Sequence, residues 1–211
     1  MINVLYIHGM GGGGDSRIPS IMRSHLDEKG VNVVVRTYDF DPEKATLQID
    51  SWMKELSPAL VIGESLGSIH ALRQEGIPHI LISPSLNAPY YLGYLSWLAL
   101  IPGVTCLFDR IYRPRDGDRQ PLHFRFSTLE KYIRHGKLAR LNSPRSGSED
   151  HFFAFIGTRD HYRKWGVVSV RTWKKYYGDN YMIYEGTHFT EEEHIIDKIL
   201  PYICNLLDIN K

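Results

Sequence analysis

The sequence predicts an α/β fold, with a parallel sheet of about six strands and helices on both of its faces. Short runs rich in valine, isoleucine, leucine and tyrosine recur along the 211 residues, as is typical of strands buried on both faces. Segments with helical periodicity separate most of these runs, and strands that alternate with helices form parallel sheets. The composition, 43% hydrophobic and 23% charged, is sufficient for a large core.

The first half of the chain follows this alternation closely. The expected strands share short β-branched or aliphatic runs and cover residues 2–7, 31–38, 60–63 and 79–83. The expected helices show apolar residues on one side and cover residues 15–28, 42–56 and 68–75. Asp15 or Ser16 suits the cap of the first helix, Pro42 suits the first turn of the second, and Gly76 ends the third.

The alternation breaks after the fourth strand and returns near the carboxyl end. Residues 86–147 contain no convincing buried strand and predict a cap-like, mainly helical insertion within a single domain spanning 1–211. Its expected parts are helices near 90–100 and 127–141 and a charged loop at 110–125. Beyond it we expect strands at 152–156 and 181–184 and a helix over 165–177, irregular at its start because of Gly166 and the β-branched residues after it. The last helix begins near Glu191, where Thr190 and Glu193 fit a capping box, and Pro201 should kink it.

The segment G-E-S-L-G at residues 63–67 stands between a predicted strand and a predicted helix. This setting is that of a nucleophile elbow, a sharp turn that exposes a reactive serine hydroxyl. The small residues Gly63 and Gly67 suit such a turn. The alternative interpretation is a turn rich in glycine and serine that has no chemical role.

Other polar motifs follow the ends of the first, fifth and sixth predicted strands. They are H-G-M-G at residues 8–11, Asp160 and His188. Because the carboxyl ends of parallel strands meet at one edge of a sheet, we expect these motifs to lie near Ser65. The chain order serine, aspartate, histidine is also that of a hydrolase triad.

Together these motifs resemble the α/β-hydrolase superfamily, and most closely its small single-domain bacterial serine esterases. The resemblance covers nearly the whole chain and is weakest over 86–147. It implies that the chain starts at the strand that normally comes third, so that the sheet order is 2-1-3-4-5-6. It also implies that Ser65 is the nucleophile, that His188 is the general base, and that the Asp160 carboxylate orients His188. The oxyanion hole would be formed by the backbone N–H groups of Met10 and Leu66.

Several nearby residues leave alternatives open. Asp116 and Asp118 compete with Asp160, although they lie in the insertion. We expect His8 to order its turn and His161 to lie on the surface. Glu64 either lies near the pocket floor or hydrogen-bonds to a neighbouring loop. No metal-ligand spacing is present, so neither a metal nor a cofactor is expected.

The insertion offers a substrate-binding surface. Tyr90, Tyr91, Tyr94 and Trp97 would form an apolar wall near Ser65, or else core between the insertion and the sheet. Residues 109–145 contain ten Lys/Arg and four Asp/Glu, a net charge of +6. That basic stretch is either a solvated surface or a face that attracts an anionic substrate or partner.

We therefore expect a serine hydrolase acting on a small-molecule ester or acyl substrate. The alternatives are a thioesterase, amidase or acyltransferase with the same triad, another non-hydrolytic enzyme such as a lyase, and a catalytically idle interaction protein.

The overall charge of +1 does not indicate a nucleic-acid partner. Prolines and glycines interrupt the uncharged stretch 83–108, which argues against stable membrane insertion. The amino terminus lacks signal-peptide features, and Cys106 and Cys204 are expected to be buried thiols, so we expect a cytoplasmic protein. The oligomeric state stays open.

Overall fold

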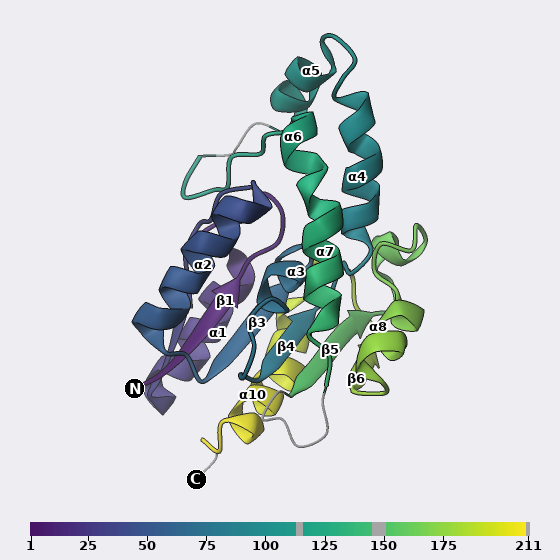
Figure 1. Ribbon diagram of the computed structural model, residues 1–211. Coiled ribbons are helices and arrows are strands. Elements are labelled where there is room, and N and C mark those ends of the chain that lie inside the picture. The colour runs from purple at the N-terminus through teal and green to yellow at the C-terminus, as the bar shows by residue number, and fades with distance from the viewer. Residues whose placement is uncertain (113–115, 145–150, 210–211) are drawn as a thin grey trace.

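A computed structural model describes residues 1–112, 116–144 and 151–209. At its centre is one six-stranded sheet in the order β2-β1-β3-β4-β5-β6, and every neighbouring pair of strands is parallel (Figure 1). The strands are β1 (Ile2–Ile7), β2 (Val31–Val35), β3 (Leu60–Glu64), β4 (His79–Ile82), β5 (Phe152–Gly157) and β6 (Tyr181–Tyr184). The predicted sheet and its order are therefore confirmed.

Alternate side chains along the strands enter two separate cores. Leu5 and Ile7 face a core that also holds apolar residues of α2 (Pro42–Leu56), α3 (Gly67–Ala71), α7 (Lys131–Leu141) and α8 (Val170–Tyr177). Val4 and Tyr6 face a second core with α1 (Arg17–Leu26), η3 (Ile195–Ile199) and α10 (Leu200–Leu206). Each fully buried aliphatic side chain contributes roughly 1.5–3 kcal/mol to folding. The two cores thus hold the sheet rigidly from both sides.

Two predicted elements of the first half end earlier than expected. Strand β2 stops at Val35 rather than at residue 38, because Tyr38 leaves the sheet and donates its hydroxyl hydrogen bond to the His8 carbonyl oxygen at 2.6 Å. Helix α3 stops at Ala71. The Asn142 side chain donates to the carbonyl oxygens of Leu72 and Gln74, at 3.0 and 2.7 Å, so a turn replaces the predicted continuation of the helix.

The helix starts also differ from one another. Asp41 caps α2 by accepting a hydrogen bond from the Glu43 N–H, and Pro42 follows it in the first turn, as predicted. Ser16 occupies the cap position of α1, but its hydroxyl accepts from the Gly13 N–H at 3.0 Å instead. The first helix continues through η1 (Asp27–Lys29) and ends at Gly30, whose φ is +74°.

The helix expected over 165–177 is irregular at its start, as predicted, and begins later than residue 165. The segment before α8 forms η2 (His161–Arg163), and Gly166 has a φ of +70°, outside the helical range. Helix α8 begins only at Val170, after Ser169, whose hydroxyl accepts from the Thr172 N–H at 3.2 Å. Local turn chemistry therefore overrides the apolar periodicity of this stretch.

The predicted capping box at the last helix is wrong. Thr190 has a φ of +30°, and its hydroxyl lies 2.8 Å from the Tyr184 hydroxyl. Glu191 takes the cap position of α9 (Glu192–His194), without a side-chain bond to that helix. The wide π turn of η3 ends two residues before Pro201, which supplies no N–H, so the expected irregularity near this proline takes the form of a π segment.

The insertion after β4 is helical, as predicted. Its helices are α4 (Ala88–Leu98), α5 (Val104–Ile111), α6 (Phe126–Leu129) and α7. Figure 1 shows α4, α5 and α6 projecting away from the sheet, and α7 returns between α4 and α3. Helix α5 was not predicted, although its apolar residues Val104, Leu107, Phe108 and Ile111 have helical spacing; none of its residues is fully buried. The expected boundary at 147 lies outside the described residues, as do Arg113, Arg115 and Arg145 of the basic stretch.

The two cysteines have different surroundings. Cys204 is buried, as expected, whereas Cys106 is exposed on α5, so the prediction of two buried thiols is wrong. Both are free thiols. Within the described residues, no helix combines the length and the apolar character that crossing a bilayer requires.

Candidate active site

Ser65 occupies a strained turn between β3 and α3. Its φ is +49°, a conformation that costs a non-glycine residue on the order of 1–3 kcal/mol. Hydrogen bonds from the Ser65 N–H to the Ile82 carbonyl oxygen (2.9 Å) and from the Ser85 N–H to the Ser65 carbonyl oxygen (3.1 Å) hold this backbone in place. The neighbouring strand thus holds the serine in its strained conformation.

The glycines around Ser65 are required by close packing. A Cβ atom on Gly67 would lie 2.3 Å from the carbonyl oxygens of Ile7 and His8. A Cβ atom on Gly63 would lie 2.8 Å from that of Ala71. Both separations are too short for real contacts, which explains why the serine is flanked by glycine at both positions.

His188 lies within hydrogen-bond distance of both Ser65 and Asp160. The Nε2 atom of His188 lies 2.8 Å from Ser65 Oγ, and its Nδ1 atom lies 2.8 Å from Asp160 Oδ2. Asp160 also accepts a hydrogen bond from the Tyr162 N–H at 2.9 Å. The Asp160 carboxylate accepts a hydrogen bond from the His188 Nδ1–H group, which leaves the Nε2 lone pair facing the serine hydroxyl. The three predicted residues therefore form a continuous chain of contacts.

The contacts among Ser65, His188 and Asp160 are largely buried, unlike ordinary contacts on a protein surface. His188 is 4% exposed and Asp160 is 2% exposed. The Tyr162 ring packs edge-on against the His188 ring, with centroids 4.5 Å apart. Charge interactions are stronger in such a water-poor environment than in bulk water. The carboxylate and the imidazole are thus held in a setting where each strongly affects the other.

The competing aspartates lie elsewhere. Asp118 accepts hydrogen bonds from the Thr37 hydroxyl at 2.5 Å and from the Gly14 N–H at 3.1 Å. Asp116 is exposed. Among the described carboxylates, Asp160 is the one that His188 contacts.

The glycine turn after β1 lies against the nucleophile. A Cβ atom on Gly9 would be 3.1 Å from Ser65 Cβ. In the part of the chain that the structure describes, neither the Met10 N–H nor the Leu66 N–H donates to a protein acceptor. Both N–H groups are therefore available to a ligand, as an oxyanion hole requires.

Gln120 from the insertion fixes that turn, although no sequence pattern marks this residue. Its side-chain oxygen accepts from the Gly11 N–H at 3.1 Å, and its side-chain nitrogen donates to the Tyr38 carbonyl oxygen at 3.0 Å. Its own N–H donates to the Gly12 carbonyl oxygen at 2.7 Å. Gln120 is 1% exposed. The insertion thus reaches back to position the backbone beside Ser65.

His8 is part of the same support. Its ring stacks on the Tyr38 ring with centroids 4.4 Å apart, and its Nδ1 atom lies 2.7 Å from the Gly9 carbonyl oxygen. Burial lowers the pKa of His8 to about 4, so the ring is neutral near pH 7. These contacts fit the expected structural role. His161 is exposed, as predicted.

A pocket of about 350 Å³ opens beside the glycine turn. Its lining residues come from both sides of the sheet edge: Gly9, Met10, Gly11, Gly12, Ser16, Arg17, Ile18, Glu64, Arg119 and Phe189. Glu64 lines this pocket and accepts a hydrogen bond from the Tyr6 hydroxyl at 2.7 Å. Arg17 donates to the carbonyl oxygens of Phe189 and Thr190. The pocket nearest the glycine turn therefore has both polar and apolar walls, whereas an apolar wall was expected.

The four aromatic residues predicted to bind substrate lie along α4. Tyr94 and Trp97 are 76% and 67% exposed. The Tyr90 hydroxyl accepts from Arg140, and the Tyr91 hydroxyl donates to the Trp165 carbonyl oxygen. The described residues that line the pocket beside the glycine turn do not include these four. Their contact with substrate stays a prediction.

Two further residues support the site without having been predicted. Ser85 Oγ lies 3.1 Å from Ser65 Oγ. The Glu191 carboxylate accepts from the Thr187 N–H and so anchors the loop that carries His188. Partial burial raises the pKa of Glu191, whereas the hydrogen bonds that its carboxylate accepts lower that pKa. Together the hydrogen bonds outweigh burial, so the pKa lies below its ordinary value.

Comparisons with known proteins agree at the level of the fold. A scan of protein-family models returns no match for this sequence, and a search of curated proteins returns none either. Solved structures do match along almost the whole chain. A monoacylglycerol lipase from Paleococcus ferrophilus has a TM-score of 0.65 at 18% identity, with 99% of this chain and 95% of that chain covered.

Two further matches are similar in extent. Est1E from Butyrivibrio proteoclasticus, with ferulic acid bound, has a TM-score of 0.63 at 15% identity, with 99% of this chain and 90% of that chain covered. A thermophilic esterase from Thermogutta terrifontis has a TM-score of 0.63 at 11% identity, with 100% and 91% covered. These neighbours show that the chain has the α/β-hydrolase fold. At this identity, the reaction has to be argued from the site itself.

Proposed function

Since the chain has the α/β-hydrolase fold, we propose that it is a serine hydrolase that cleaves small-molecule carboxylic esters through an acyl-enzyme intermediate. The observation that carries this proposal is the pair of 2.8 Å contacts that link Ser65, His188 and Asp160. A serine hydroxyl is a poor nucleophile unless a base removes its proton. His188 is within reach to be that base, and Asp160 keeps its second nitrogen protonated.

Acylation begins when Ser65 Oγ bonds to the ester carbonyl carbon and its proton passes to His188 Nε2. The carbonyl oxygen becomes an oxyanion, which the N–H groups of Met10 and Leu66 stabilise. Each such donor is typically worth about 2.7–4 kcal/mol in the transition state. The bond to the alcohol oxygen then breaks, and that oxygen takes the proton from His188.

Deacylation reverses these roles. Water adds to the acyl carbon and gives a proton to His188. The bond to Ser65 Oγ breaks, Oγ takes the proton back, and the acid leaves. The pocket beside the glycine turn supports a substrate with a polar group, because Glu64 and Arg119 line it together with the oxyanion residue Met10.

A fluorophosphonate probe tests the nucleophile directly. We expect labelling of the wild-type protein and of Ser85→Ala, which removes the neighbouring hydroxyl, and no labelling of Ser65→Ala. The Ser65→Ala variant should also lose turnover of p-nitrophenyl acetate by about 10⁴-fold or more. Absence of labelling in the folded wild-type protein would favour an idle interaction protein instead.

Matched acetyl substrates separate the related reactions. We expect kcat/KM for the ester to exceed that for the corresponding thioester and anilide. An added alcohol acceptor should not divert most of the acyl group from water. A thioester preference would identify a thioesterase, and dominant transfer to the alcohol would identify an acyltransferase. Either result would overturn the ester assignment while leaving Ser65 as nucleophile.

A further inference from the structure

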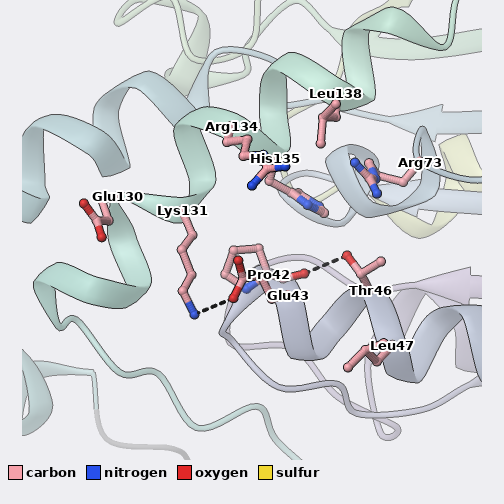
Figure 2. Close-up of a pocket in the computed structure, with 10 residues that line it drawn as sticks. All are labelled: Pro42, Glu43, Thr46, Leu47, Arg73, Glu130, Lys131, Arg134, His135 and Leu138. Carbon is pink, nitrogen blue, oxygen red and sulfur yellow. Dashed lines mark hydrogen bonds and ion pairs between the residues drawn. The ribbon is translucent and has the colours of Figure 1, made fainter.

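A second pocket, of about 560 Å³, lies between α2 and α7, away from the glycine turn (Figure 2). Its lining residues are Pro42, Glu43, Thr46, Leu47, Arg73, Glu130, Lys131, Arg134, His135 and Leu138. None of these residues lines the pocket beside the glycine turn. Arg73 follows the end of α3, whereas Ser65 precedes its start, so the helix separates the two places. We call this second pocket the α2–α7 groove.

Of the positively charged side chains that line the groove, one is neutralised by ion pairs within the described ranges and two are not. Lys131 forms ion pairs with Asp41 at 2.7 Å and with Glu43 at 2.8 Å, and these contacts close one end of the groove. Figure 2 shows the Glu130 side chain beyond that end, away from the other lining residues. Within the described residues, the guanidinium groups of Arg73 and Arg134 have neither a hydrogen bond nor an ion pair. Two free cations therefore remain on the groove.

A neutral histidine lies on the wall that carries these cations. The Nε2 atom of His135 lies 3.0 Å from His70 Nδ1, and both rings are buried. Burial lowers the pKa of His135 to about 3, and the nearby Arg73 charge lowers it further in the same direction. His135 is thus neutral, and neither a carboxylate nor another acceptor contacts the Arg73 guanidinium in the described part of the chain. The cation is left to a partner from solution.

The opposite walls of the groove are apolar at their edges. Leu47 on α2 is 73% exposed and Leu138 on α7 is 38% exposed. Figure 2 places Leu47 below the opening and Leu138 above it. Burying such side chains under a ligand is favourable by about 25 cal/mol per Å² of apolar surface. The groove therefore combines an anion-binding part with an apolar part.

We propose that the α2–α7 groove is a binding site for a small amphipathic carboxylate. Arg73 and Arg134 hold the carboxylate, and the alkyl chain lies between Leu47 and Leu138. Guanidinium groups match a carboxylate in charge and in hydrogen-bond geometry. The volume of the groove falls within the usual range for small-ligand pockets. The proposal is independent of the reaction at Ser65.

Isothermal titration calorimetry with octanoate tests this site. We expect octanoate to bind the wild-type protein and to bind at least about tenfold more weakly to Arg73→Gln and to Arg134→Gln, because each variant removes a charge-assisted contact. The matched control is Arg171→Gln, which removes an exposed arginine on α8 and should leave the affinity unchanged. Circular dichroism confirms that each variant is folded.

Two probe molecules separate the contributions. Octanamide has the same chain without the charge, and butyrate has the charge with a shorter chain. Both should bind about tenfold more weakly than octanoate. Octanoate should also shift the NMR signals of the His135 ring. No binding at millimolar octanoate, equal binding of octanamide, or affinity unchanged in both arginine variants would overturn the proposal. The last result would place octanoate elsewhere, including at Ser65.

Discussion

At the scale of single residues, the carboxylate that orients His188 is open to a direct test. In Asp160→Asn, an amide NH₂ facing His188 Nδ1 forces the proton onto Nε2, which then no longer accepts from Ser65. We expect kcat for p-nitrophenyl acetate to fall by roughly 10³–10⁴-fold. Steady-state kinetics measure this change.

The matched control is Asp116→Asn, which changes an exposed aspartate of the insertion. It should retain kcat within about twofold, because surface substitutions usually have small effects. If Asp160→Asn retained full activity, another group would have to orient His188.

The residues of the candidate site were predictable only where they end a strand. Ser65, Asp160 and His188 each follow a short apolar run, and the topology of parallel strands brings such positions together. Ser85 also follows a strand, three residues after β4 ends, so the same argument could have found it. Gln120 follows no strand. Its contacts depend on how the insertion folds back, and single-sequence patterns do not encode that path.

At the scale of elements, the glycine turn depends on the connecting segment that contains Gln120. Gln120→Leu preserves the approximate volume but removes the hydrogen bonds to Gly11 N–H and to the Tyr38 carbonyl oxygen. The turn then loses its fixed position beside Ser65, and the Met10 N–H moves away from the oxyanion. We expect kcat to fall by about 10–100-fold, with a smaller change in KM.

The control for this prediction is His123→Ala, an exposed position in the same connecting segment. Its kcat and KM should both stay near the wild-type values. Thermal unfolding of Gln120→Leu shows whether the protein remains folded at the assay temperature. A folded variant in which KM rises and kcat is unchanged would mean that Gln120 acts on substrate binding and not on the oxyanion turn.

Element boundaries failed where local polar contacts compete with periodicity. Thr190 was predicted as a cap but bonds to Tyr184 across the turn. Helix α5 has apolar residues at helical spacing, but it is short and none of its residues is fully buried. Helix α2, by contrast, has an aspartate cap, an initial proline and an apolar stripe that agree, and its predicted bounds are correct.

At the scale of the whole molecule, the sheet was predictable because both of its faces are buried. Most of the strands are then nearly continuous apolar runs, although the edge strand β6 is partly exposed, and the helices between the strands enforce parallel order. The insertion packs mainly helix on helix, so its arrangement above the sheet leaves a weaker signal. The cytoplasmic location and the single-domain organisation expected from the sequence stay predictions.

The buried histidines on one side of the sheet make the stability of the whole molecule depend on pH. Burial lowers the pKa of His8 to about 4 and of His135 to about 3, and it lowers that of His70 well below its ordinary value. An unfolded chain binds these protons near pH 6.5. Between pH 6.5 and about 4 the unfolded state therefore holds more protons than the folded state. The free energy of unfolding must fall as the pH falls through this window.

Urea denaturation at pH 7 and pH 5 measures this dependence, and His135→Gln isolates one contributor. Between these pH values each buried histidine should cost on the order of 1–2 kcal/mol of stability. His135→Gln should lose about that much less than wild type, whatever its stability at pH 7. The exposed His25 provides the matched control, and His25→Gln should show the wild-type pH dependence. An identical loss in both variants would mean that His135 is protonated in the folded protein at pH 5, or that it does not contribute to the acid sensitivity.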